Sequence, residues 1–533
     1  MRLNQVWING FKNLNDFSLS FDQASPYTVL VGQNGSGKSN LIEALVYLFS
    51  ELDSQSPAPF DYQITYGMTG HEDPESPQEV TIRGEKGKIP VVRVNRIELS
   101  RAELSRRANS ESHDYLPRFV FVYYSGPTPR LTDYFAKSQE RFYQKLKHPK
   151  AQSGDLPARR MFLAQTRHSQ FVLLAFYSHH DPVAQAFLKE HLSIVDVDFI
   201  KFVIRKPSWA KSNTPDRFWG TTGIPRQMIE LLERFSIATT KTRRKLALDF
   251  RRNTTLDCWN FLLDRAGFEK MASQYATPQD LFKALESTDI SELLFDLEVT
   301  VKIENVDGSI SHHELSEGEQ QLLLVLGLLR FTKQEDALFL LDEPDTHLNP
   351  SWSVQFLNFI DRIVGEQPKS HVIMATHDPL VFAGLRGDQV RIMDWAEDGR
   401  VTAREPEEDP RGMGVEAILT SDLFGLRAAV DLPTLEMLDD RQRLMAKEAI
   451  SPEEELQLAD LSRKIEVLGY GGDYSDPTFV EFTRAFSRWR EQQNLFKPVL
   501  TAGERRTQHD EAVRLVQKIK AGAGVNDDET NRQ

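Results

Sequence analysis

The chain has 533 residues, of which 40% are hydrophobic, and its formal net charge at pH 7 is −14. This length suffices for about two or three domains with cores of their own. No apolar run reaches the roughly 18 residues of a membrane span, and the first residues lack a signal peptide's apolar core. Cys258 is the only cysteine, which excludes an intrachain disulfide and a zinc site made of cysteines. We therefore expect a cytoplasmic enzyme.

The first motif in chain order is a glycine-rich segment. Residues 32–39, GQNGSGKS, match the pattern G-x4-G-K-[S/T]. An apolar run at 28–31 precedes the segment and a helical pattern at 40–49 follows, which is the strand–loop–helix context of a phosphate-binding loop. Backbone N–H groups and the helix N-terminus would bind the phosphates of ATP, Lys38 would add a positive charge, and Ser39 would bind Mg²⁺. The residues that we assign to nucleotide binding here are Asn34, Gly35, Gly37, Lys38, Ser39 and Asn40.

The second motif is the apolar segment 337–341, which runs directly into two carboxylates. This pattern predicts a central parallel strand that delivers Asp342 and Glu343 at its C-terminal edge. Asp342 would hold Mg²⁺ through water, and Glu343 would act as the general base on the attacking water. An acidic strand end is usually only a solvated edge, but LSEGEQ at 315–320 and His377 favour the catalytic interpretation.

Together these segments resemble the head of the ATP-binding-cassette (ABC) ATPases, in the branch that contains RecF, RecN, the SMC proteins and the OLD-type ATPases. LSEGEQ is similar to the family signature LSGGQ, with Glu317 in place of the first glycine. Residues 345–350 resemble the D-loop, and His377 resembles the catalytic switch histidine. The resemblance implies an α/β, ABC-type P-loop ATPase head with a mixed sheet. It also implies that the signature reaches the nucleotide of a second copy, through Ser316, Gly318 and Glu319.

The motifs divide the chain into parts. Residues 1–130 and 296–410 are expected to form the two halves of the ATPase head, and 131–295 a mainly helical insertion lobe. No sustained heptad occurs in the lobe, which separates this chain from the SMC proteins with their long coiled-coil arms. Residues 411–520 are expected to form a helical extension, and 521–533 a disordered tail.

The extension contains a predicted helical hairpin. Its second helix has Ser451 as N-cap, Pro452 at the first helical position and Glu454 to close a capping box. Apolar residues at helical spacing predict a helix–helix seam made of Leu458, Leu461, Ile465 and Leu468. A Toprim nuclease centre is not recognised here, because Asp473 and Asp476 follow no strand pattern.

Basic residues gather in one interval of this acidic chain. Residues 201–253 carry 13 Lys and Arg against 4 Asp and Glu, interleaved with Phe202, Trp209, Phe218 and Trp219. Phosphate neutralisation with ring stacking would suit single-stranded nucleic acid. A solvated face or a salt-bridged subunit contact explains the same pattern, and both interpretations stay open.

The compact insert, SDLFGL at 421–426 and the hairpin resemble the stand-alone ATPases of Septu and retron anti-phage defence systems, which work with a separate HNH nuclease. The resemblance implies a homodimer or higher oligomer that hydrolyses ATP and regulates this effector. One alternative is a DNA-repair or recombination ATPase of RecF type that acts on DNA ends or gaps. Another is a scaffold that holds ATP with little turnover.

Overall fold

The computed structural model describes most of the chain and divides it into two compact units. The described residues are 1–22, 24–69, 77–109, 115–126, 129–146, 159–210, 216–247, 253–304, 308–332, 335–364, 369–447, 449–468, 477–495, 500 and 502–520. The first unit comprises Met1–Val381 and Asp388–Glu405, and the second comprises Phe382–Gly387 and Pro406–Gln533. No helix within the described ranges combines the length and the apolar character that a membrane span requires.

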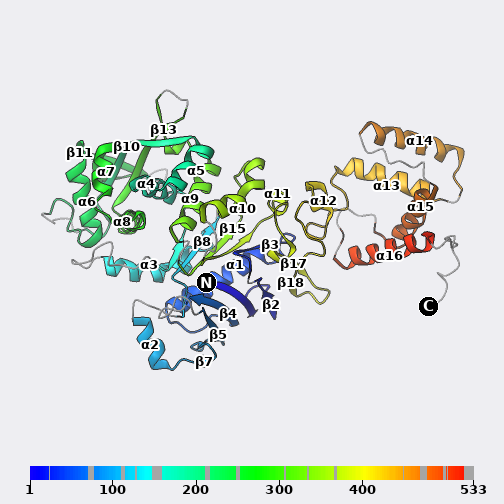
Figure 1. Cartoon of the computed structure of the whole chain (residues 1–533), viewed down its shortest axis with the longest axis horizontal. Helices are drawn as coiled ribbons and strands as arrows, with labels where there is room; N and C mark the ends of the chain where they lie inside the picture. The colour runs from blue at the N-terminus through cyan, green and yellow to red at the C-terminus, as the bar shows by residue number, and fades with distance from the viewer. Residues whose placement is uncertain are drawn as a thin grey trace. The chain divides into compact units, whose positions relative to one another are not determined.

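A seven-stranded sheet with the order β18-β17-β3-β16-β15-β8-β9 forms the centre of the first unit (Figure 1). All neighbouring strands are parallel except the β17–β18 hairpin. β15 is buried along its whole length, as its five apolar residues before Asp342 predict. The strands are β3 (Tyr27–Val31), β8 (Phe119–Tyr124), β9 (Met161–Leu163), β15 (Ala337–Asp342), β16 (His371–Ala375), β17 (Val390–Trp395) and β18 (Val401–Arg404).

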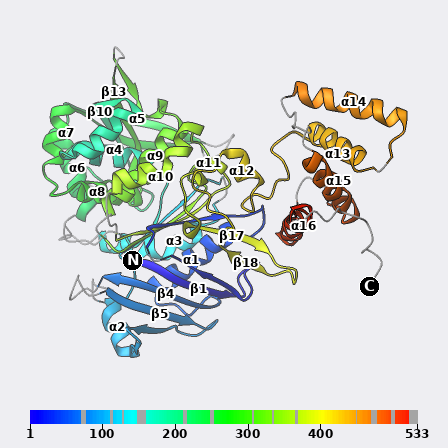
Figure 2. The same ribbon diagram turned by 45° about the vertical axis from the view of Figure 1, so that its right-hand side comes forward.

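A second, antiparallel sheet with the order β2-β1-β4-β5-β6-β7 completes the head. The helix α1 (Lys38–Asp53) runs between the two sheets (Figure 2) and is buried around nearly its whole circumference. Side chains such as Val6, Leu45 and Leu340 belong to one continuous core. The strands of this sheet are β1 (Arg2–Asn9), β2 (Phe17–Ser20), β4 (Asp61–Thr69), β5 (Pro77–Gly84), β6 (Val91–Val94) and β7 (Ile97–Glu98); the helix α2 (Arg101–Asn109) follows.

The interval predicted as a mainly helical lobe also supplies β10, β11 and β12 to a five-stranded antiparallel sheet, which the sequence interpretation did not predict. Helices do exceed strands there, but the order β11-β12-β10-β13-β14 forms the framework. β11 reads ATTKTRRKLA and lacks the alternating apolar pattern that marks a strand. It pairs with β12, and the apolar residues of this strand pair lie mainly on β12. The strands are β10 (Ile194–Arg205), β11 (Ala238–Ala247), β12 (Asn253–Asp264), β13 (Leu294–Ile303) and β14 (Ser309–Ser311).

Helices surround this sheet and connect it with the head. The helix α4 packs against both α8 and α9, which joins the insert to the head. The helices of the first unit that follow α2 are α3 (Thr132–Leu146), α4 (His168–Ser178), α5 (Pro182–Leu192), α6 (Gly223–Phe235), α7 (Arg265–Ala272), α8 (Pro278–Ile290), the short η2 (His312–Glu314), α9 (Glu317–Thr332), α10 (Pro350–Val364) and η3 (Gly387–Gln389). The short helix α11 (Pro379–Phe382) ends where the chain leaves this unit.

The second unit is helical and contains the predicted hairpin. The capping box at the start of α14 is confirmed, since the Ser451 side chain accepts from the Glu454 N–H and the Glu454 carboxylate accepts from the Ser451 N–H. The predicted seam is only partly buried: Ile465 is buried, whereas Leu468 is exposed. Residues 521–533, Asp473 and Asp476 lie outside the described residues. The helices are α12 (Val415–Thr420), α13 (Leu432–Ala446), α14 (Pro452–Val467), α15 (Pro477–Gln492) and α16 (Ala502–Lys520).

Candidate ATP-binding site

The phosphate loop forms a tight turn between β3 and α1. Gly32, Gly35 and Gly37 have φ values of 151°, 83° and 100°, in the region that favours glycine. A Cβ atom on Gly32 would lie 2.1 Å from the backbone oxygen of Met393, so a larger residue cannot take this position without a backbone shift. The loop therefore has the shape that the sequence predicts, with its N–H groups at the start of α1.

Lys38 folds back over the loop. Its Nζ donates to the backbone oxygen of Gly32 at 2.6 Å and of Gln33 at 3.3 Å. Burial lowers the pKa of Lys38, and the negative charges of Glu343 and Asp342 act in the opposite direction. The ammonium group is thus bonded to two neutral carbonyl oxygens. The charged oxygens of a phosphate would be stronger hydrogen-bond acceptors for it.

Asp342 meets Ser39 at the end of β15. The Ser39 hydroxyl donates to Oδ1 of Asp342 at 3.1 Å, although 303 positions separate them in sequence. Asp342 is only 4% exposed, and burial raises its pKa to about 6. A hydroxyl and a buried carboxylate are oxygen ligands suited to Mg²⁺, which commonly takes few protein ligands together with phosphates and water. The described residues contain no group of three or more His, Cys, Asp or Glu able to hold a metal ion.

The predicted base and the predicted switch histidine lie side by side. The Nδ1 atom of His377 lies 3.0 Å from Oε1 of Glu343. The backbone N–H of Glu343 donates to the oxygen of Ala375, at the end of the neighbouring strand β16. Glu343 has a φ of 54°, which costs a non-glycine residue on the order of 1–3 kcal/mol. The fold thus holds Glu343 in a strained conformation at the edge of the sheet.

A buried hydrogen bond joins the D-loop to the segment before His377. The carboxylate of Asp345 accepts from the hydroxyl of Thr376, and that hydroxyl accepts from the N–H of Asp378 at 3.0 Å. Burial raises the pKa of Asp345 to about 6. A displacement of the D-loop would therefore be transmitted to the segment that carries the histidine.

The signature lies at the N-terminus of α9, as predicted. The N–H and hydroxyl of Ser316 donate to Glu319 at 2.7 and 2.8 Å, and the Glu319 N–H donates back at 3.3 Å. A Cβ atom on Gly318 would lie 2.4 Å from the backbone oxygen of His347, so the helix start packs tightly on the D-loop. Among the described residues, no hydrogen bond or ion pair joins the signature to the phosphate loop of the same chain.

The loop after β1 supports the phosphate loop, and the sequence interpretation missed it. Asn13 donates to the backbone oxygen of Gly35 at 3.1 Å, and Asn40 donates to Asn13 at 2.6 Å. Asn40 also accepts from Arg130, so its side chain is directed to these neighbours. No local pattern marks Asn13 or Arg130, because their role arises only when the sheets are assembled.

The basic interval 201–253 forms ion pairs within the five-stranded sheet. Arg244 lies 3.5 Å from Asp296, and Lys201 lies 2.8 Å from Glu298. The rings of Phe202 and Phe218 are buried, so neither can stack on a base in this structure. Because these ion pairs lie within one chain, they are not the predicted subunit contact, and both interpretations of the basic interval stay predictions.

Two family models match the chain. Residues 1–114 match a model described as an AAA ATPase domain. Residues 211–383 match a model described as an AAA domain, putative AbiEii toxin, Type IV TA system. The first contains the phosphate loop, and the second contains the signature, Asp342, Glu343 and His377.

Curated relatives match shorter stretches. The Septu protein PtuA of Bacillus mycoides (strain KBAB4) is 29% identical over 175 residues, 31% of this chain and 24% of that protein. The probable peptide export ATP-binding protein YydI of Bacillus subtilis (strain 168) is 27% identical over 88 residues, 16% of this chain and 41% of that protein. The chain thus spans less than half the length of each of these relatives.

Solved structures similar to the chain include SMC heads and RecF. An SMC head bound to the C-winged helix domain of ScpA has a TM-score of 0.33 and 14% identity, over 76% of this chain and 97% of that chain. The recombination mediator protein RecF with ATP has a TM-score of 0.28 and 14% identity, over 76% of this chain and 97% of that chain.

The buried carboxyl of Asp342 predicts a pH-dependent stability. Between pH values of about 4 and 6 the folded protein keeps a proton that the unfolded chain has released, so stability falls as pH rises through this window. Without nucleotide, Asp342→Asn should therefore stabilise the fold at pH 7.5 by about 1–3 kcal/mol, with little effect at pH 4. Thermal unfolding at both pH values measures this, with the exposed Asp440→Asn as the control. An unfolding temperature equal to that of wild type at pH 7.5 would contradict the assignment.

Lys38, Ser39, Asp342, Glu343 and His377 thus converge at one edge of a parallel sheet. The order of the motifs and the two ATPase family models agree with this geometry. The chain thus contains ATPase domains, as the two family models show, and the order of its motifs resembles that of the ABC-type ATPases.

Proposed function

We propose that the chain binds and hydrolyses ATP at a site that a second copy of the chain completes. The observation that carries the proposal is the contact of Ser39 with Asp342, since it joins the phosphate loop to the carboxylate strand. Glu343 follows Asp342 directly, which places a base beside the same site. The signature makes no contact with this loop among the described residues, which leaves Ser316 and Gly318 for the nucleotide of another copy.

Each residue has a distinct task in the proposed reaction. Lys38 would exchange its two carbonyl acceptors for phosphate oxygens. Ser39 and Asp342 would hold Mg²⁺, which neutralises developing charge on the phosphates when it is bound. Glu343 would accept a proton from the attacking water, and His377, 3.0 Å away, would orient the carboxylate.

The proposal extends to a separate effector. The relative named the Septu protein PtuA supports a role in bacterial anti-phage defence, in a Septu or retron type of system. The family resemblance implies that an HNH nuclease, similar to the partner called PtuB, is the effector. No nuclease centre is recognised in the sequence, so ATP-driven closure of two heads would act on this partner.

The helix α14 supplies a candidate docking surface for the effector. Leu456 and Val467 are 74% and 82% exposed. They lie eleven positions apart, about three helical turns, so they share one face of the helix. Exposed apolar side chains at such spacing are typical of helices that bind a partner.

Two substitutions test hydrolysis. Lys38→Ala should abolish ATP binding, because the loop loses its charge. Glu343→Gln should retain ATP and lower the hydrolysis rate at least about 100-fold, because an amide cannot accept the proton. Binding of a fluorescent ATP analogue and release of phosphate measure the two effects, with the exposed Glu397→Gln as control. Turnover like that of wild type in Glu343→Gln would remove the proposed mechanism.

The docking surface predicts a separation of functions. Leu456→Ser combined with Val467→Ser should lower co-purification of the proposed HNH nuclease partner at least about fivefold, through loss of apolar contact. ATP binding should stay unchanged. The matched control is Gln457→Ser with Glu466→Ser, two exposed polar neighbours that flank the apolar face on either side. Full co-purification by the first variant would place the docking site elsewhere.

A further inference from the structure

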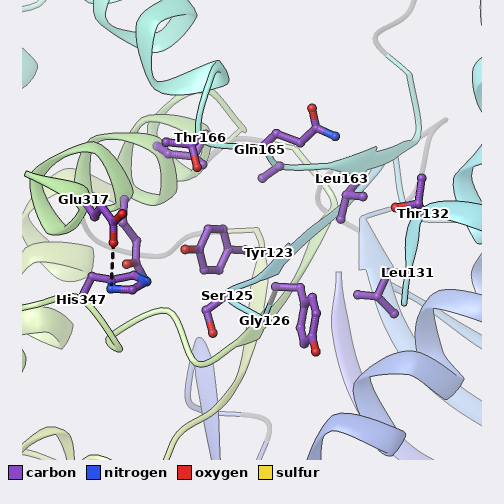
Figure 3. A pocket seen from close by; sticks show the side chains of 14 residues that line it. Tyr123, Ser125, Gly126, Leu131, Thr132, Leu163, Gln165, Thr166, Glu317 and His347 are labelled. Atoms are coloured by element: carbon purple, nitrogen blue, oxygen red, sulfur yellow. Dashed lines mark ion pairs between the residues drawn. The ribbon is translucent and has the colours of Figure 1, made fainter. Parts of the chain in front are cut away.

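A cavity of about 390 Å³ lies at the carboxyl ends of β8 and β9 (Figure 3). Its walls are residues 123–126 at the end of β8, residues 163–166 at the end of β9, residues 131–132 at the start of α3, and side chains from α9 and the D-loop. None of the residues assigned above to the phosphates, Mg²⁺ or the general base lines it. The cavity is therefore a site that the proposed ATPase reaction does not use.

The polar side of the cavity is acidic and aromatic. Glu317 lies 3.3 Å from His347, and Figure 3 shows both beside the ring of Tyr123. Burial, and then the charge of Glu317, raises the pKa of Tyr123 to about 12, so its hydroxyl keeps its proton. Among the described lining residues none is a lysine or arginine. An anionic ligand such as a phosphate would find no lysine or arginine partner here and would lie near the carboxylate of Glu317.

Gln321 adds an acceptor that lacks a donor. Its Nε2 donates to the backbone oxygen of Pro344, which fixes the orientation of the amide. Its Oε1 is buried and has no partner among the described residues. Such an atom costs about 1–3 kcal/mol, which a hydrogen-bond donor that reached it from the cavity would offset. Leu131, Leu163 and Leu324 form an apolar wall for a hydrocarbon stem.

We propose that this cavity binds an arginine side chain that a separate protein partner presents. The guanidinium group carries five donors and no acceptor, which matches a carboxylate and an unpartnered amide oxygen. Its flat face suits the ring of Tyr123, and its stem suits the leucines. The identity of the protein that presents the arginine rests on the effector of the proposed function. The chemistry by which the cavity recognises an arginine does not depend on that function.

The cavity wall is connected to the signature by hydrogen bonds. The hydroxyl of Ser169 donates to the backbone oxygen of Thr166 at 2.6 Å and lies 3.3 Å from Nε2 of His312. The N–H of Leu315 in turn donates to the oxygen of His312 at 3.1 Å. Glu317 itself belongs to the signature helix. If a ligand in the cavity binds one arrangement of these residues more tightly than another, it shifts the signature toward the arrangement that it prefers.

The first experiment uses N-acetyl-arginine-N-methylamide as the probe and ligand-observed NMR on the full chain without nucleotide. The matched probe N-acetyl-norleucine-N-methylamide has a stem but no charge. We expect the arginine probe to bind at least about tenfold more tightly than the norleucine probe. Equal affinity of the two probes, or tighter binding of spermidine than of the arginine probe, would overturn the proposal.

Variants locate the binding. Glu317→Gln removes the charge and Leu163→Trp fills the cavity, and each should weaken the arginine probe at least about tenfold. Glu314→Gln, an exposed carboxylate outside the cavity, should leave the affinity unchanged. Thermal unfolding of each variant verifies its fold. Unchanged affinity in both cavity variants, each folded, would contradict the site.

A parallel measurement separates this proposal from the proposed function. Binding of a fluorescent ATP analogue to the same samples tests the ATPase proposal alone. A wild-type chain that binds the ATP analogue but not the arginine probe would overturn only the cavity assignment. Probe binding without ATP binding by the wild-type chain would overturn only the proposed ATPase.

Discussion

Parallel pairing of β3, β16 and β15 is the constraint on which the site depends. It places the ends of three apolar strands at one edge, so that Ser39 meets Asp342 and Glu343 meets His377. The residues that would bind ATP come from opposite ends of the head sequence. The buried helix α1 and the second sheet hold this edge in place, because both contribute to one continuous core.

The same arrangement stores unfavourable energy at the site. Asp342 and Asp345 are buried carboxyls whose pKa values burial raises to about 6, and Glu343 lies in the left-handed region of backbone space. The packed core of the two sheets holds these residues in their buried and strained conformations, which their own backbone and solvation preferences would disfavour. A bound cation and phosphates would offset much of the cost, which couples nucleotide binding to stability.

The sequence was sufficient for the features that local patterns encode. The phosphate loop, the strand before Asp342, the helix after Ser316 and the capping box at Ser451 all follow from residue type and spacing over short stretches. The polar strand β11 was missed because its neighbour carries the apolar residues. Contacts of Asn13 with the phosphate loop and the cavity beside Tyr123 exist only after distant segments assemble, so no local pattern could reveal them.

The central claim is that two copies share each ATP site, and mixed variants test it most directly. Lys38→Ala disables the phosphate loop and Ser316→Arg disables the signature, so each variant alone should be inactive. In an equal mixture, half of the twofold dimers contain one copy of each variant, and each of these dimers keeps one intact site out of two. The mixture should therefore hydrolyse ATP at about a quarter of the wild-type rate. A mixture no more active than either variant alone, with mixed dimers verified by mass, would contradict the shared site.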